Sequence, residues 1–193
     1  MACTAGDRSR RRLALEVVAA GARLADAGLI LPGEGNLSVR SGGGELLITP
    51  TGVDKGRLAA PDLVVISLDG SSVPAAASCE SRLHTALYSR FLDIGAIVHA
   101  HPPATQALTA RGRQPDLGIL VEGVEFLGFV AWVGRLPPGS MALAEAVAGA
   151  IDQGPACLLE GHGAVTVGAS MDEAMRRMLL LERVARLTIA AER

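Results

Sequence analysis

Short apolar stretches bounded by glycine-rich turns alternate with longer amphipathic stretches along most of this chain of 193 residues. The short stretches have the length and aliphatic composition of buried β-strands, and some lie close enough in sequence to form hairpins. The longer stretches repeat apolar residues every three or four positions, which is the spacing of a helix with one buried face. This alternation predicts a layered α/β domain with a mixed sheet.

The limits of these stretches define the elements that we expect. Helices are expected at residues 8–28, 78–92, 103–111, 140–153 and 171–192. Strands are expected at residues 36–40, 45–49, 63–68, 96–101, 157–160 and 164–167, with one or two more within 119–133. Because domains commonly contain about 100–200 residues, we expect one domain over residues 1–193, with residues 1–8 as a flexible tail.

The composition restricts both the core and the partners of this protein. The chain contains three Phe, one Tyr and one Trp, so its core must be aliphatic, and base stacking on aromatic side chains is disfavoured. With 18 basic and 20 acidic residues the net charge is −2, which gives no basic surplus for nucleic acid. No apolar run reaches the roughly 20 residues that span a bilayer, and three scattered cysteines do not suggest a disulfide framework. We expect a cytoplasmic protein with neither a nucleic-acid nor a membrane partner.

Three of the four histidines occupy unusual positions. His99 and His101 alternate along an expected strand, so their side chains share one face with Cα atoms roughly 6.5–7 Å apart. His162 lies between two glycines in an expected tight turn. Three imidazoles with an open fourth position are typical of catalytic zinc. A surface strand and an ordinary turn explain the same residues without a metal, and His84, within an expected helix, needs no functional explanation.

Glu80 follows Ser78, which is a good helix N-cap. An acid in the first turn of a helix is stabilised by the helix dipole and needs no further role. The alternative is a carboxylate beside a metal, acting as a fourth ligand or as a base that moves a proton.

Three loops offer backbone donors with little side-chain bulk. They are residues 33–36, the pair Thr51 and Gly52, and the helix start at Ser78. Together such loops can bind a phosphate, although turn chemistry alone explains each of them. Cys79 is either a nucleophile favoured by a helix N-terminus or a small packed side chain.

Lys55 is the only lysine and lies in a polar stretch with Asp54 and Arg57. An imine mechanism needs a lysine whose pKa is lowered by an apolar pocket. The sequence therefore argues against an imine, and carbanion chemistry here would need a metal as its electron sink.

As a set, five stretches of the chain resemble the class II aldolase/adducin family, in family order and spacing over roughly residues 10–190. Within that family the chain most resembles the aldolases of L-fuculose 1-phosphate. The matching stretches are GNLSVR (35–40), ITPTGVDKGRL (48–58), SCESRLHTALY (78–88), AIVHAHPPAT (96–105) and LLEGHGAVTVG (158–168).

The resemblance implies a three-layer α/β/α sandwich around a central mixed, largely antiparallel sheet. It also implies a homotetramer with active sites at subunit interfaces and one divalent metal per subunit. By resemblance, His99, His101 and His162 are the metal ligands, and Glu80 is the acid/base and a further metal ligand. Zinc is expected, with manganese, cobalt and iron as alternatives. The substrate's phosphate would be held at Gly35, Asn36, Thr51, Gly52, Ser78 and Cys79.

The activity implied by the resemblance is that of a metal-dependent lyase. It would cleave a small ketose 1-phosphate, like L-fuculose 1-phosphate, into dihydroxyacetone phosphate and an aldehyde by retro-aldol chemistry. Glu80 would take the C4 hydroxyl proton.

The chain departs from the family in two places. Gly33 and Glu34 occupy a phosphate loop where threonine is usual at the first position, and Cys79 often has serine as its counterpart. The family's tyrosines are also missing, since the only tyrosine is Tyr88. These departures keep open a decarboxylase or dehydratase of a related sugar (phosphate) acid, which would use the same metal enediolate. A non-catalytic assembly module like adducin is a more distant alternative.

Overall fold

The computed structural model describes residues 5–192, and these form a sheet in the order β3-β2-β1-β4-β7-β6-β5. Only β5 and β6 pair in parallel, and all other neighbours are antiparallel. The predicted mixed, largely antiparallel sheet is confirmed. The strands are β1 (Asn36–Gly42), β2 (Glu45–Ile48), β3 (Val64–Ser67), β4 (Ala96–Ala100), β5 (Val130–Val133), β6 (Ala156–Leu159) and β7 (Gly163–Gly168).

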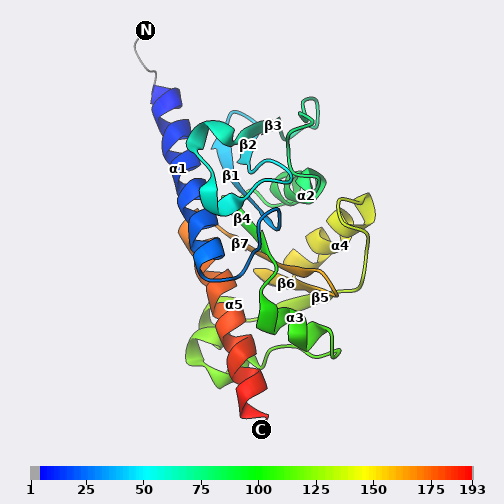
Figure 1. Ribbon diagram of the computed structural model, residues 1–193. Coiled ribbons are helices and arrows are strands. Elements are labelled where there is room, and N and C mark those ends of the chain that lie inside the picture. Colours follow the sequence, from blue (N-terminus) through cyan, green and yellow to red (C-terminus); the bar gives the residue numbers. More distant parts are fainter. Residues whose placement is uncertain (1–4, 193) are drawn as a thin grey trace.

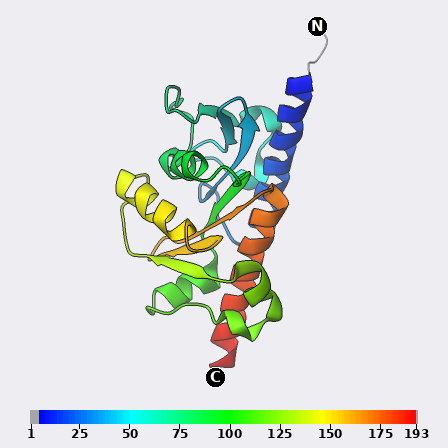
Figure 2. The ribbon, with the colours of Figure 1, turned by 180° about the vertical axis from the view of Figure 1, so that it is seen from behind.

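Helices cover both faces of this sheet, which confirms the three-layer α/β/α sandwich. Helices α1 (Ala5–Asp26) and α5 (Met171–Ala191) run along one face, and α2 (Ser81–Arg90) and α4 (Met141–Ile151) cover the other (Figures 1 and 2). The short helix α3 (Pro103–Thr109) directly follows β4. No helix within residues 5–192 has both the length and the apolar composition that crossing a membrane requires.

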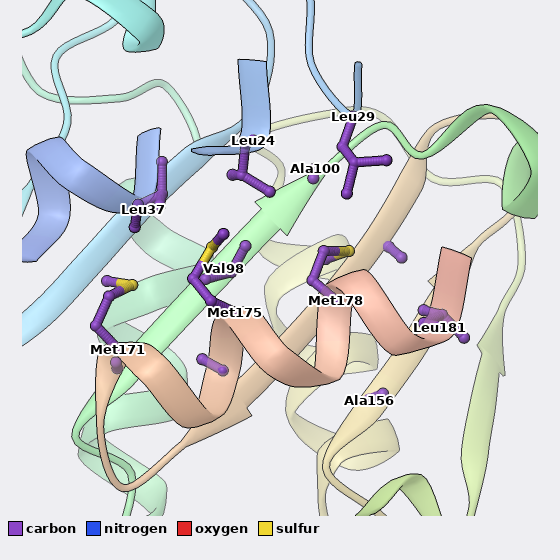
Figure 3. Packing of buried hydrophobic residues seen from close by; sticks show 14 of the residues in the cluster. Leu24, Leu29, Leu37, Val98, Ala100, Ala156, Met171, Met175, Met178 and Leu181 are labelled. Atoms are coloured by element: carbon purple, nitrogen blue, oxygen red, sulfur yellow. The ribbon is translucent and has the colours of Figure 1, made fainter. Parts of the chain in front are cut away.

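Aliphatic and methionine side chains form the buried cluster between α1, α5 and the sheet. Met171, Met175, Met178 and Leu181 repeat along one face of α5 and belong to the same buried cluster as Val98 on β4 (Figure 3). All five are buried, with at most 4% of their surface exposed. The predicted aliphatic core is therefore observed here, with methionine filling much of it because its unbranched side chain adapts to irregular gaps.

Two predicted helix starts need correction. Helix α1 begins at Ala5, so residues 5–8, expected in a flexible tail, are helical, and residues 1–4 of that tail lie outside the described part. Arg10 pairs with Glu45 on β2, which ties the early turns of α1 to the sheet. Helix α2 begins at Ser81 rather than at residue 78.

The later start of α2 changes the position of Glu80. Ser78 Oγ accepts a hydrogen bond from Glu80 N at 3.3 Å, and Ser81 N donates to Ser78 O at 3.0 Å, so these residues form a turn ahead of the helix. Glu80 has non-helical backbone angles and makes no capping hydrogen bond with its side chain. Its carboxylate is therefore not used by its own helix.

The segment 119–133, where one or two strands were expected, contains one strand. Residues Leu117–Ile119 form a 3₁₀ turn and Gly123–Leu127 a π-helical turn before β5 begins at Val130. The side chain of Asp116 accepts from Gly118 N and starts the first turn. Val121 is 79% exposed, so the apolar residues here do not form the buried face that a strand would need.

A buried acid on α5 holds the chain where it leaves β4. Glu182 accepts hydrogen bonds from the backbone N–H groups of Ala104 and Thr105 at 3.1 and 3.0 Å, at the start of α3. Gln106 on the same helix donates to His162 O at 2.7 Å, which connects α3 to the turn between β6 and β7. These bonds fix the chain on both sides of the histidines described below.

We expect Glu182→Ala to lower the free energy of unfolding by about 1–3 kcal/mol, because it leaves buried N–H donors without an acceptor. Urea denaturation measures the loss. The exposed Glu145 on α4 offers the matched control, and Glu145→Ala is expected to change stability by less than about 0.5 kcal/mol. Equal losses in the two variants would contradict a specific role for Glu182.

Candidate metal centre

Three imidazoles meet at one end of the β4–β7 pair. His99 lies on β4, His101 follows the last residue of that strand, and His162 lies in the turn that precedes β7. Their ring centroids are 4.7–5.1 Å apart, and one ligand nitrogen from each lies within 4.8 Å of the others. The structure thus brings together the three residues that the sequence singled out.

The hydrogen bonds of these rings leave nitrogen lone pairs facing one another. His99 Nδ1 donates to Ala164 O at 3.0 Å, so the neutral ring presents an acceptor at Nε2. His101 Nε2 lies only 3.3 Å from that atom. Two imidazole nitrogens this close can bind the same cation, and imidazole nitrogen is a common ligand for divalent transition metals.

Glu80 lies against the same nitrogens. Its Oε2 is 3.1 Å from His99 Nε2 and its Oε1 is 3.8 Å from His162 Nε2. The carboxylate is buried, and within residues 5–192 neither Glu80 Oε1 nor His162 Nδ1 has a hydrogen-bond partner. Buried polar atoms without partners are costly, and a divalent cation beside Glu80 Oε1 would satisfy that oxygen. The donor set fits such an ion.

The protonation states also suit a cation. Burial raises the pKa of Glu80, but the neighbouring His99 ring, the hydrogen bond from Asn36 and the His162 ring outweigh burial and hold the pKa below its ordinary value. Burial lowers the pKa of His162 to about 4, with the nearby His99 ring adding to the shift, and burial likewise lowers that of His101. An ionised carboxylate and neutral imidazoles are the forms that bind metal.

Asn36, predicted to hold phosphate, points its side-chain amide at Glu80. Its Nδ2 donates to Glu80 Oε2 at 2.9 Å, and its Oδ1 lies 2.5 Å from His84 Nε2. His84 is completely buried, in keeping with the structural role expected for it. One Nδ2 hydrogen of Asn36 remains free of these two contacts.

Glu34 has a position that its sequence context did not indicate. Its Oε2 accepts from Leu31 N at 2.9 Å, and its Oε1 lies 3.4 Å from His101 Nδ1. A metal-bound histidine commonly directs its second ring nitrogen at a carboxylate, which fixes the orientation of the ring. Glu34 thus faces His101, whereas the sequence alone placed it only in a phosphate loop.

The predicted loops converge on a cavity of about 190 Å³ beside the histidines. Cys79 is exposed there rather than packed in the core, whereas Ser78 is buried. His99 lies behind the cavity, and His101 and His162 line it. All of the predicted loop residues line this cavity: Gly33, Glu34, Gly35, Asn36, Thr51, Gly52, Ser78 and Cys79.

Lys55 also lines this cavity and is buried, although the sequence around it is polar. Its side chain is 2% exposed, Nζ donates to Gly33 O at 3.3 Å, and burial lowers its pKa. Helix α1 covers this loop closely, since a Cβ on Gly21 would lie 2.5 Å from Lys55 O. A glycine inside a helical pattern often marks such an approach, and Gly21 was the available signal.

Comparisons with known proteins agree with this geometry. The family described as class II aldolase and adducin N-terminal domain matches residues 15–189. The methylthioribulose-1-phosphate dehydratase of Acidiphilium cryptum is 35% identical over 192 residues, which cover 92% of this chain and 90% of that protein. The L-fuculose phosphate aldolase of Methanococcus maripaludis is 32% identical over 164 residues, which cover 85% of this chain and 89% of that protein.

A solved structure is similar to this chain over almost its whole length. The L-fuculose-1-phosphate aldolase from Thermus thermophilus has a TM-score of 0.86 and 35% identity, and the match covers 94% of each chain. Class II aldolases depend on a divalent metal, and the cluster of His99, His101 and His162 is able to hold one. The chain is therefore an enzyme that belongs to the class II aldolase and adducin family.

Proposed function

We propose that this enzyme is a metal-dependent lyase that cleaves a small ketose 1-phosphate into dihydroxyacetone phosphate and an aldehyde by retro-aldol chemistry. The observation that carries the proposal is the position of Glu80, whose carboxylate oxygens lie 3.1 and 3.8 Å from two of the three converging imidazoles. A base is thus held beside a place where a cation would polarise the substrate. The names of the similar aldolases support the substrate class.

His99, His101 and His162 would hold one divalent cation per subunit, with zinc proposed first and manganese, cobalt or iron as alternatives. When bound, the cation would act as a Lewis acid on the ketose oxygens and stabilise the negative charge that develops there.

Glu80 moves the proton in this proposal. Its lowered pKa keeps the carboxylate ionised at neutral pH, ready to accept the proton of the substrate's C4 hydroxyl. The C3–C4 bond then breaks, C4 becomes the aldehyde carbon, and the electron pair remains with the three-carbon phosphate fragment. A proton added at C3 completes dihydroxyacetone phosphate.

The lining of the cavity also suits the phosphate. Residues 33–36 and the pair Thr51 and Gly52 present backbone and hydroxyl groups to it, and Ser78 and Cys79 line the same cavity. Lys55 adds positive charge, and within the described residues it has no ion pair with a carboxylate at 4.0 Å or less. We therefore assign Lys55 to the binding of the phosphate.

Dehydration of a ketose phosphate is the second candidate, and the position of Tyr88 favours it. Tyr88 is the only tyrosine of the chain and is completely buried away from the cavity lining, so it cannot protonate C3 after cleavage. In a dehydration Glu80 would take the C3 proton and return it to the departing C4 hydroxyl, which leaves as water. The remaining enol becomes a diketone when C4 gains a proton and the C3 hydroxyl loses one. A relative named as a dehydratase supports this reading.

We also propose a homotetramer with active sites at its subunit interfaces. Large apolar side chains that a single chain leaves exposed, among them Phe129 and Met141, support an assembly of several copies. We place the enzyme in the cytoplasm, in keeping with the free thiols of Cys79 and Cys157.

Metal-loaded enzyme incubated with a panel of ketose 1-phosphates separates the candidate reactions. We expect dihydroxyacetone phosphate and an aldehyde from at least one substrate, measured by coupled reduction and mass spectrometry. A diketone phosphate with loss of water would establish the dehydratase instead, and release of carbon dioxide from a sugar acid would establish a decarboxylase. No product from any of these compounds would refute the proposed function.

His101→Ala is expected to lose both metal and activity, whereas Glu80→Gln is expected to keep its metal and lose turnover by about 100-fold or more, because only the proton acceptor is removed. Elemental analysis after dialysis and initial rates measure the two quantities. If Glu80→Gln loses as much metal as His101→Ala, the two residues do not have separate roles.

Lys55→Met is expected to raise KM for a phosphorylated ketose by about 10- to 100-fold, because hydrogen bonds to charged groups contribute about 1.5–3 kcal/mol. Metal content should not change. Arg57→Met removes an exposed positive charge two residues away and serves as the control. Borohydride added with substrate should not trap an adduct on Lys55, and a trapped adduct would restore the imine mechanism. Equal effects of the two substitutions would remove Lys55 from the phosphate site.

A further inference from the structure

A chain of buried polar side chains connects α2 to Glu80 across β1. Tyr88 OH lies 2.9 Å from Ser38 Oγ, and Ser38 Oγ lies 2.6 Å from His84 Nδ1. His84 Nε2 lies 2.5 Å from Asn36 Oδ1, and Asn36 Nδ2 donates to Glu80 Oε2 at 2.9 Å. None of the first four side chains is more than 3% exposed, so water does not compete for these bonds.

The donor and the acceptor of each hydrogen bond in this chain can be assigned in turn, starting from Glu80. An ionised carboxylate only accepts, so the Asn36 amide nitrogen donates to it, and the amide oxygen must face His84. That oxygen also only accepts, so the hydrogen of the His84 ring is on Nε2. Burial lowers the pKa of His84 to about 3, which leaves Nδ1 as an acceptor.

The remaining bonds follow in the same order. Ser38 donates to His84 Nδ1, and Tyr88 donates to Ser38 Oγ, since burial raises the Tyr88 pKa and keeps its hydrogen in place. An amide side chain does not relay protons, so Asn36 ends any route for a proton from Tyr88. The chain of bonds orients groups rather than conducting protons.

We propose that His84 is a positioning residue whose Nε2–H tautomer fixes the Asn36 amide and thereby holds Glu80 Oε2, leaving Glu80 Oε1 as the oxygen that moves the substrate's proton. Oε1 is the carboxylate oxygen without a hydrogen-bond partner in the described structure. The opposite tautomer would turn the Asn36 oxygen toward Glu80 and repel it. This inference rests on the proposed role of Glu80 as the base.

The chain offers a direct probe, because Asn36 is its only asparagine. Labelling with ¹⁵N-asparagine yields a single pair of side-chain amide signals, which report on Asn36 without any substrate. In the metal-free protein we expect distinct, protected amide hydrogens for Asn36, and ¹⁵N signals of His84 that identify the Nε2–H tautomer. An Nδ1–H tautomer would overturn the proposal, whether or not the enzyme turns over any substrate.

Two substitutions at His84 test the function of that geometry. Glutamine can donate from nearly the position of Nε2, so His84→Gln should retain the Asn36 signals and most of kcat. His84→Leu should shift or merge these signals and lower kcat by about 10- to 100-fold, with KM and metal content unchanged. Thermal unfolding of both variants shows which of them are folded.

Tyr88→Phe is the matched control, because it removes the donor farthest from Glu80. It should lower stability while leaving the Asn36 signals and kcat close to those of the unmodified enzyme. If His84→Leu is folded and leaves the Asn36 signals or kcat unchanged, His84 does not position Glu80. If no ketose phosphate reacts but the signals change as expected, the proposed function fails while the positioning of Glu80 stands.

Discussion

Antiparallel pairing of β4 with its two neighbours is the constraint on which the site depends. His99 lies opposite Val165 of β7 and opposite Asn36 of β1, so a slip of one residue would turn its ring to the other face of the sheet. Both neighbours approach closely through glycine. A Cβ on Gly163 would lie 2.3 Å from Ala100 O, and a Cβ on Gly35 would lie 2.7 Å from His99 O. The glycines around His162 and before Asn36 therefore serve strand packing as well as access.

The second constraint is electrostatic. Burying a carboxylate costs several kcal/mol unless charges and hydrogen bonds compensate. Glu80 has His99 beside it and a donor from Asn36, and its second oxygen remains without a partner within residues 5–192. A buried carboxylate with a hydrogen-bond partner on only one of its two oxygens is unfavourable for the stability of the fold. In the proposed function a cation and a substrate hydroxyl would complete the other side, and Glu80 lines the cavity that would hold them.

The sequence predicted the parts of the site that depend on local periodicity. Two-residue spacing on a strand places His99 and His101 together, and the glycines around His162 indicate a turn that leaves a ring accessible. The burial of Lys55 was not predictable from its polar neighbours, because it results from α1 crossing the loop at Gly21. The orientation of Glu34 toward His101 likewise depends on a contact between distant segments. In the fold, the apolar stretch within 119–133 resembled strands because periodicity does not report the turn that Asp116 starts.

The proposed cleavage of a carbon–carbon bond and the alternative loss of water differ in the atom that receives the proton after Glu80 has taken it up. Both proposed reactions would begin with proton transfer to Glu80, whose Oε1 has no hydrogen-bond partner within the described residues. Cleavage would then need a proton at C3 of the three-carbon fragment. Dehydration would pass the proton to the leaving C4 hydroxyl and give an enol, which becomes the diketone when C4 gains a proton and the C3 hydroxyl loses one. In either reaction Glu80 can return the proton that it has taken up. The other protonatable side chains that line the cavity within the described part of the chain, apart from the imidazoles, are Glu34, Lys55 and Cys79. In the proposed function, the position of the phosphate in the cavity would decide which carbon faces Glu80, and the residues that bind the substrate would therefore also determine its reaction.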